Sequence, residues 1–151
     1  MKYWNTITTE EDMAEACEDA ADLLEGHWTT GEWYHEWWVD NAGNHYDWND
    51  GTVELTEQWA YCIEGAMAAA IGLDATDLDC DSEERSNLLR CPVYKAVCDT
   101  LNLQQETEGV VDIRYGVGDL PNWNDNGALG SEQKALDLLR ATAKRLRGVE
   151  A

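Results

Sequence analysis

The sequence has 151 residues, of which 44% are apolar, so it is long enough for one domain with a buried core and too apolar for a fully disordered acidic tail. Its 31 acidic and 10 basic residues give a formal net charge of -21, which argues against direct binding to nucleic acid or an anionic membrane, because both require positive potential. We therefore expect residues 1–151 to form a single acidic domain.

The first predicted helix covers residues 9–25. Thr8 and Glu11 have the spacing of a capping box, and apolar residues recur after them at helical intervals. Gly26 supplies the stop signal that is common at the end of a helix.

The composition changes at residues 27–50, which are rich in tryptophan, tyrosine, histidine and turn-forming residues. The turn residues 41–44 lie between two aromatic runs, and this arrangement favours a two-stranded hairpin. A short helix over residues 32–38 is the alternative, because Trp33 and Trp37 are four residues apart.

A second helix is predicted for residues 57–71, with Thr56 as its cap and Gly72 as its end. The middle of this segment consists mostly of alanine and glycine, and such small side chains let neighbouring backbones come close. We therefore expect this helix to lie at the centre of the fold.

Three further elements are predicted in the second half of the chain. Residues 82–101 favour a helical region that Pro92 kinks or divides. Residues 110–115 indicate a short strand, and residues 131–147 indicate a final helix. Together the elements predict the α+β class: a compact domain with about four helices packed on a small hairpin-based antiparallel sheet.

Acidic residues form a regular row on the polar side of the first helix. Its members are Glu11, Glu15, Glu18, Asp22 and Glu25. Spacings of three and four residues place them in one line on a helix, where each pair of like charges costs about 0.2–0.5 kcal/mol. We expect this row to bind a basic partner protein. General acidity that serves solubility or life in high salt is the alternative.

Half of the chain's positive charge lies in the final helix. The residues are Lys134, Arg140, Lys144, Arg145 and Arg147. We expect this helix to dock on the acidic body and to relieve part of its charge repulsion.

Tryptophan is concentrated in the hairpin segment, and phenylalanine is absent from the chain. In a strand, Trp37 and Trp38 point to opposite faces, so both cannot easily be buried in a small sheet. We expect Trp33, Trp37 and Trp38 to act as partner-binding anchors beside the acidic row, because tryptophan is favoured in interfaces. Core packing is the alternative for these residues.

The cysteine pattern favours free thiols in the protein interior, because no Cys-x-x-Cys spacing occurs. We predict no catalytic residue, no metal site and no cofactor. A small cysteine hydrolase is one alternative, with Cys62 as nucleophile, Asn124 as orienting residue and one of His27, His35 and His45 as base. A structural protein that self-associates through its tryptophans is another. No apolar run is long enough to cross a membrane, so we predict a cytoplasmic location.

Two short motifs connect the chain to a known group of proteins. They are AYCIEGA at residues 60–66 and NWND at residues 122–125, the latter ahead of the final helix. In these motifs the chain resembles a family of small uncharacterised proteins that is common in actinobacteria and their phages. The resemblance implies a phage-type accessory context and no catalytic residue.

From the charge pattern and this resemblance we expect a phage-encoded, non-enzymatic inhibitor. It would bind a basic host protein that handles nucleic acid or serves in defence, through an acidic, DNA-mimic-like surface of the anti-CRISPR type. It would not bind nucleic acid or membrane itself.

Overall fold

The computed structural model describes residues 3–126 and 131–148, and within them it contains six α-helices, a 3-10 turn and a three-stranded sheet. The α+β class is thereby confirmed. The helices are α1 (Glu10–Leu24), α2 (Ile63–Ala70), α3 (Glu83–Arg90), α4 (Pro92–Thr107), α5 (Leu120–Asp125) and α6 (Glu132–Leu146), and the 3-10 turn is η1 (Ala75–Asp77). The strands are β1 (Tyr34–Val39), β2 (His45–Tyr46) and β3 (Thr56–Tyr61).

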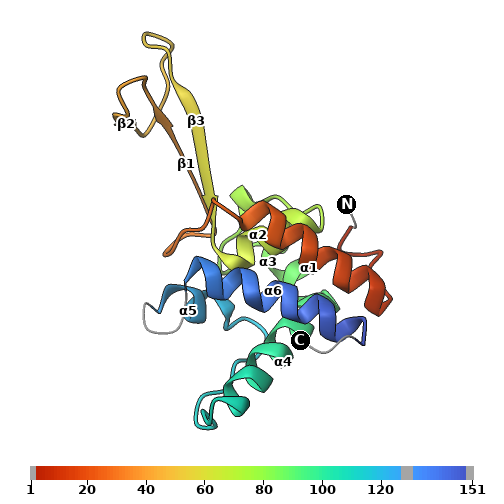
Figure 1. Cartoon of the computed structure of the whole chain (residues 1–151). Coiled ribbons are helices and arrows are strands. Elements are labelled where there is room, and N and C mark those ends of the chain that lie inside the picture. The colour runs from red at the N-terminus through yellow and green to blue at the C-terminus, as the bar shows by residue number, and fades with distance from the viewer. Residues whose placement is uncertain (1–2, 127–130, 149–151) are drawn as a thin grey trace.

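The start of the first helix and its cap each lie one residue later than predicted. Thr9, and not Thr8, caps α1, because its hydroxyl oxygen accepts a hydrogen bond from the Asp12 backbone nitrogen at 3.0 Å. The buried side of α1 consists mainly of alanines. Small side chains allow close approach, and α1 packs against α2 on one side and α6 on another (Figure 1).

The predicted hairpin is confirmed, and the alternative helix over residues 32–38 is wrong. β1 pairs with β2 through a turn in which Asp40 Oδ1 accepts hydrogen bonds from the backbone nitrogens of Ala42 and Asn44. The longer ladder, however, joins β1 to β3, from Tyr34 opposite Tyr61 to Val39 opposite Thr56. All pairs are antiparallel and the order is β2-β1-β3.

The second predicted helix is wrong in its first part, since residues 56–61 are strand β3 and helix α2 begins only at Ile63. Cys62 is the cap residue of α2, and its Sγ accepts a hydrogen bond from the Gly65 nitrogen at 3.4 Å. Threonine, tryptophan and tyrosine in this segment favour strands, and pairing with β1 decides the outcome. The predicted end of the helix at Gly72 is confirmed by its φ of +80°.

The helical region of the second half is divided at Pro92 as predicted. α3 ends at Arg90, and Pro92 occupies the first turn of α4. The lack of an N–H there removes no hydrogen bond, because the first backbone nitrogens of a helix have no partner within the helix. The final helix is also confirmed, with Ser131 as its cap.

The predicted strand at residues 110–115 is wrong, because this segment runs beside a helix and not beside another strand. The side-chain amides of Asn102 and Gln105 on α4 donate to the carbonyl oxygens of Tyr115 and Ile113. Side chains of α4 thus satisfy backbone groups that a neighbouring strand would otherwise satisfy.

The hydrophobic core lies entirely in the helical body. It includes Ile63 and Met67 of α2, Val97 of α4, and Leu138 and Leu139 of α6. No residue from 35 to 60, all of which the structure describes, belongs to this core. Figure 1 shows the reason: β1 and β3 form a long ribbon that projects away from the helices. We call residues 34–61 the arm.

Candidate functional site

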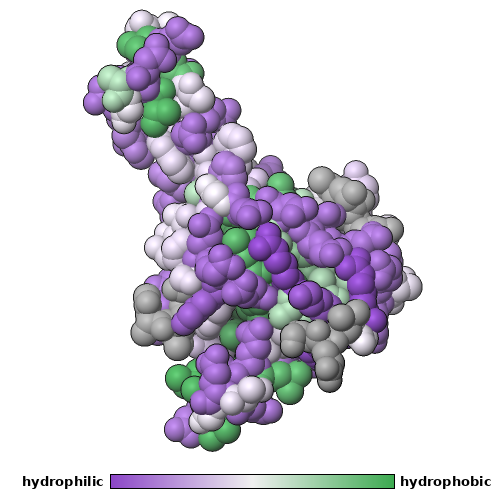
Figure 2. Space-filling view, viewed as in Figure 1, coloured by the Kyte–Doolittle hydropathy of each residue, from purple (hydrophilic) through white to green (hydrophobic). Residues whose placement is uncertain are grey.

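The arm is strongly acidic and exposed. It contains no lysine or arginine, and its carboxylates are Glu36, Asp40, Asp47, Asp50, Glu54 and Glu57. Every side chain from residue 41 to residue 54 is exposed. Figure 2 shows mostly hydrophilic residues along the arm, with hydrophobic patches among them near its tip.

One face of the arm carries a stack of three rings. The Trp37 indole lies between two imidazoles, with ring centroids 5.2 Å from His35 and 5.7 Å from His45. His35 Nδ1 is also 3.0 Å from a Glu32 carboxylate oxygen. These contacts join β1 to β2 without a buried core, so the stack stiffens the outer part of the arm.

The opposite face presents aromatic rings to solvent. Trp38, Trp59 and Tyr46 lie on it, and Trp59 and Tyr46 are 38% and 37% exposed. Beyond the ladder, Trp48 is 66% exposed. Large aromatic side chains that remain open to solvent are typical of protein interfaces.

A buried carboxylate anchors the base of the arm to the helical body. Glu64 of α2 has no exposed surface, and it accepts hydrogen bonds from Trp33 Nε1 at 2.8 Å, Arg85 Nε at 2.7 Å and Tyr94 Oη at 2.6 Å. The Arg85 guanidinium also lies 5.6 Å from the Trp33 ring centroid. The hydrogen bond to Glu64 raises the pKa of Arg85, and burial together with the Glu64 charge raises the pKa of Tyr94.

A second anchor is the side-chain amide of Asn124 on α5. Its Oδ1 accepts hydrogen bonds from Trp28 Nε1 and from the Ile63 backbone nitrogen, each at 2.9 Å. Its Nδ2 donates to the Thr29 carbonyl oxygen at 3.0 Å. Asn124 therefore ties the segment before the arm to the start of α2, and it joins the two motifs at residues 60–66 and 122–125.

The acidic row of α1 faces arginines of the chain itself. The Arg147 guanidinium binds Glu11, with Nη2 at 2.8 Å, and Glu18, with Nη1 at 2.7 Å. Arg140 Nη2 lies 3.2 Å from Glu25. The predicted docking of the basic final helix on the acidic body is thus confirmed, and the hydrogen bond from Arg147 lowers the pKa of Glu11.

The remaining members of the row differ in exposure, since Glu15 is half-buried and Asp22 is exposed. Whether the row touches a partner stays a prediction. Because three of its five carboxylates already bind arginine, however, the row has less charge to offer than the arm has.

The three predicted tryptophan anchors separate in the structure. Trp33 precedes β1, and it packs against the core and donates to Glu64, so it belongs to the base of the arm. Trp37 and Trp38 lie on opposite faces of β1, as the strand alternation predicts. Trp37 is engaged in the ring stack, which leaves Trp38 on the face that also presents Trp59.

Sequence reasoning missed Glu64, Arg85 and Tyr94. A signal existed for Glu64, because a single charged residue in an otherwise apolar helical segment must find a partner if it is buried. The partners could not be predicted, since Arg85 and Tyr94 come from α3 and α4 and meet Glu64 only in the folded chain.

Cys62 lacks the features of an activated nucleophile. The residue is 2% exposed, and burial raises the pKa of its thiol to about 12. The three candidate bases are engaged elsewhere: His27 stacks on Trp59, while His35 and His45 stack on Trp37. Within the residues that the structure describes, no group of three or more His, Cys, Asp or Glu side chains is placed to hold a metal ion.

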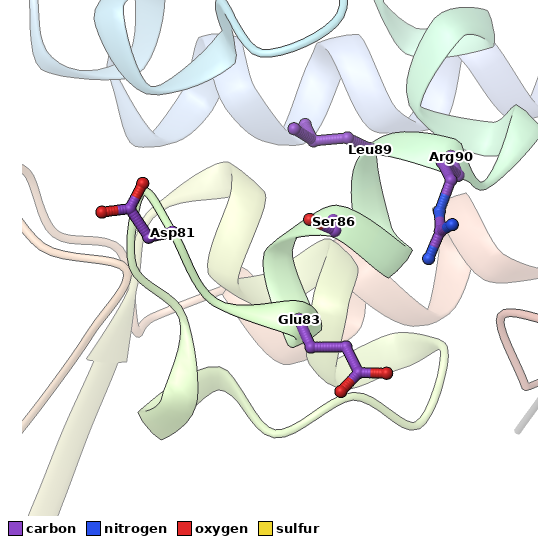
Figure 3. Close-up of a pocket in the computed structure, with 5 residues that line it drawn as sticks. All are labelled: Asp81, Glu83, Ser86, Leu89 and Arg90. Atoms are coloured by element: carbon purple, nitrogen blue, oxygen red, sulfur yellow. The ribbon is translucent and has the colours of Figure 1, made fainter.

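A shallow hollow of about 540 Å³ runs along α3, lined by Asp81, Glu83, Ser86, Leu89 and Arg90. In Figure 3 the carboxylates of Asp81 and Glu83 point away from each other, and the Arg90 side chain extends in a third direction. Arg90 Nη2 donates to Asn87 Oδ1 at 2.6 Å. Since these polar groups do not converge, the hollow is a weaker candidate than the arm and its base.

Comparison with known families gives one match. A model of a family of unknown function, DUF6197, matches residues 8–145. The chain belongs to this family. The match spans α1, the arm and nearly all of α6, so the DUF6197 region contains both the arm and its anchors. No curated protein and no solved structure matches the chain. In the part of the chain that the structure describes, no helix has the length and apolar character needed to cross a membrane.

Proposed function

We propose that this protein is a non-enzymatic binding protein that attaches to a basic partner protein through its arm. The observation that carries the proposal is the arm itself, an acidic, aromatic ribbon that projects beyond the core and is held by two buried anchors. Strands with no core beneath them contribute little to the stability of the helical body. Contact with another molecule would explain why the chain contains these strands.

The charge of the arm supports a basic partner. Six carboxylates without any lysine or arginine favour a positively charged surface and repel nucleic acid and anionic membranes. Exposed Tyr46, Trp48 and Trp59, together with half-buried Trp38, would supply contact area, while the carboxylates would steer the encounter. Large basic surfaces on proteins commonly hold phosphate backbones, so occupation by the arm would compete with nucleic acid.

The biological setting rests on the resemblance to proteins of actinobacteria and their phages. On that basis the partner is a host protein that handles nucleic acid or serves in defence, and the chain is a phage-encoded inhibitor that acts in the host cytoplasm. The acidic row of α1 would lie outside the main contact.

The experiment shortens the arm without disturbing its base. Because Val39 pairs with Thr56, residues 40–55 can be replaced by Asn-Gly, which closes β1 and β3 with a two-residue turn. This deletion removes four carboxylates. The matched control keeps the arm and neutralises four exposed carboxylates of the body, by Asp22→Asn, Glu83→Gln, Glu108→Gln and Asp112→Asn.

Capture from an actinobacterial lysate at low and high salt, followed by competition with duplex DNA, then compares the three proteins. The intact protein and the control should retain the same DNA-binding protein, with retention weakened by salt and by DNA. The shortened arm should lose it. If the protein with the shortened arm retains the partner as well as the intact protein does, the arm is not the contact. The same holds if the control loses the partner to the same extent as the protein with the shortened arm.

A further inference from the structure

The base of the arm is flanked by two hollows that meet at Tyr34. One, of about 480 Å³, is bounded by the rings of Tyr3, Tyr34 and Tyr61 and by Asp74. The other, of about 470 Å³, includes Glu32, Trp33 and Glu36. Both are lined by Tyr34, Ala75 and Thr76, so they adjoin each other between the arm and η1, and together we call them the groove. We call the first hollow the tyrosine pocket.

Three aromatic rings shape the tyrosine pocket. The rings of Tyr34 and Tyr61 lie opposite each other across β1 and β3, with centroids 5.3 Å apart and planes tilted by 50°. The Tyr3 ring packs over Gly72, where a side chain would collide with it. All three tyrosines line the pocket, and the negative face of a tyrosine ring attracts a cation.

The carboxylates around the groove strengthen that preference. Asp74 Oδ1 accepts hydrogen bonds from the Thr76 nitrogen at 2.9 Å and from its hydroxyl at 2.6 Å, and these bonds lower the pKa of Asp74. Tyr34 Oη donates to a Glu36 carboxylate oxygen at 2.9 Å. Among the described residues that line the two hollows, none is a lysine or an arginine.

The chain already contains one occupied example of the same chemistry. Next to Tyr34, the Trp33 ring and the Glu64 carboxylate together hold the guanidinium of Arg85. An aromatic face combined with a carboxylate suits arginine better than lysine, because the planar guanidinium can stack on the ring and still fork to the carboxylate. In the tyrosine pocket the ring faces and the carboxylate are present, and the binding position is open to solvent.

We infer that the tyrosine pocket binds an arginine side chain of the basic partner, with the guanidinium against Tyr34 and Tyr61 and within reach of Asp74. This inference rests on the proposed function, and it names the residue type that the partner inserts. The carboxylates of Glu32 and Glu36, farther along the groove, would accept neighbouring basic residues of the same segment.

The test uses the full chain and three short peptides, Ac-Gly-Arg-Gly-NH2 and its lysine and citrulline analogues. Citrulline keeps the shape of arginine but removes the charge. Titration followed by NMR should place the resonance shifts on Tyr3, Tyr34, Tyr61 and Asp74, and the arginine peptide should bind about tenfold more tightly than the citrulline peptide.

Two matched pairs of variants separate the pocket from general acidity. Tyr34→Leu should weaken arginine binding about fivefold, whereas Tyr34→Phe, which keeps the ring, should change it by less than about twofold. Asp74→Asn should weaken binding about threefold. Asp50→Asn is its control, because Asp50 makes the same two hydrogen bonds to Thr52 on the distant part of the arm.

Shifts spread evenly over the acidic surface, equal binding of the arginine and citrulline peptides, or equal effects of the two aspartate substitutions would each overturn the inference. Tighter binding of the lysine peptide would also overturn it. These outcomes differ from failure of the proposed function, since an arm that still captures a basic protein through its tip would survive loss of the pocket.

Discussion

At the residue scale, Glu64 is a buried carboxylate that holds separate parts of the chain together. A buried carboxylate is costly, yet here indole, guanidinium and phenol groups all donate to it. The three donors come from the start of the arm, from α3 and from α4. Glu64 therefore joins three parts of the chain, and it holds the start of the arm on the helical body.

Removal of this carboxylate should be strongly destabilising. Glu64→Leu leaves the Arg85 guanidinium, which is mostly buried, without its carboxylate partner, and we expect a loss of about 3–5 kcal/mol in the free energy of unfolding, measured in urea. The double variant Glu64→Leu with Arg85→Met should recover part of that loss, because no unpaired charge remains. Glu57→Gln, on the exposed part of β3, is the control and should change little. A loss below about 1 kcal/mol for Glu64→Leu would contradict the anchoring role.

The same residues show what could be predicted from the sequence at this scale. Trp33 and Trp38 are the same residue type five positions apart, and nothing local distinguishes them. Trp33 is a structural residue because Glu64 and Arg85 meet it in the folded chain, and Trp38 remains on the surface because no other element covers that face. Residue type and spacing indicated that these tryptophans matter, but only tertiary contacts separate their roles.

At the element scale, the base of the arm is formed where strand β3 passes into helix α2. Strand β3 ends at Tyr61, Cys62 caps the helix, and the carbonyl oxygen of Trp33 accepts a hydrogen bond from the Cys62 nitrogen at 3.3 Å. This approach brings the Trp33 backbone directly over Gly65. A glycine is required there because any Cβ would collide with the Trp33 carbonyl group.

Gly65→Ala tests this close approach, because two effects of opposite sign compete. Helix propensity alone would stabilise α2 by about 1 kcal/mol. The collision with a backbone atom should outweigh this gain, and we expect a net loss of roughly 1–3 kcal/mol in thermal or urea unfolding. Ser86→Ala on the exposed side of α3 is the matched control and should be neutral or slightly stabilising. Stabilisation by Gly65→Ala would show that the arm does not pack closely on α2.

Strand β3 also explains why part of the fold could not be predicted. Residues 56–61 carry a cap-like threonine and precede an alanine-rich helix, so local signals extend the helix backwards over them. Their true partner is β1, whose pairing residues lie 17 to 27 residues away in sequence, and such non-local pairing overrides local propensity. The helices α1 and α6 were predictable because each has a capping side chain and its own apolar periodicity, and Pro92 marked the start of α4.

At the scale of the whole molecule, the sequence gives the net charge directly, but it does not show where on the folded surface the acidic residues lie. The net charge of -21 and the basic final helix are properties of composition, and α6 does dock against α1. The projection of the arm is different, because it depends on which strands pair and on what covers them. As a result, the arm keeps six carboxylates in a segment without lysine or arginine, whereas three carboxylates of the row on α1 pair with arginine.

This distribution predicts that salt acts in opposite directions on folding and on binding. Acidic residues outnumber basic ones by 31 to 10, so screening should relieve more repulsion than it removes attraction, and Tm should rise between about 10 mM and 500 mM NaCl. Partner affinity should fall over the same range, because it depends on the unscreened arm. The body-neutralised control, with Asp22→Asn, Glu83→Gln, Glu108→Gln and Asp112→Asn, should show a smaller rise in Tm and an unchanged salt dependence of binding. If Tm falls as NaCl is added, the ion pairs between α1 and α6 outweigh the repulsion. If partner affinity does not change with salt, the electrostatic argument for a basic partner is wrong.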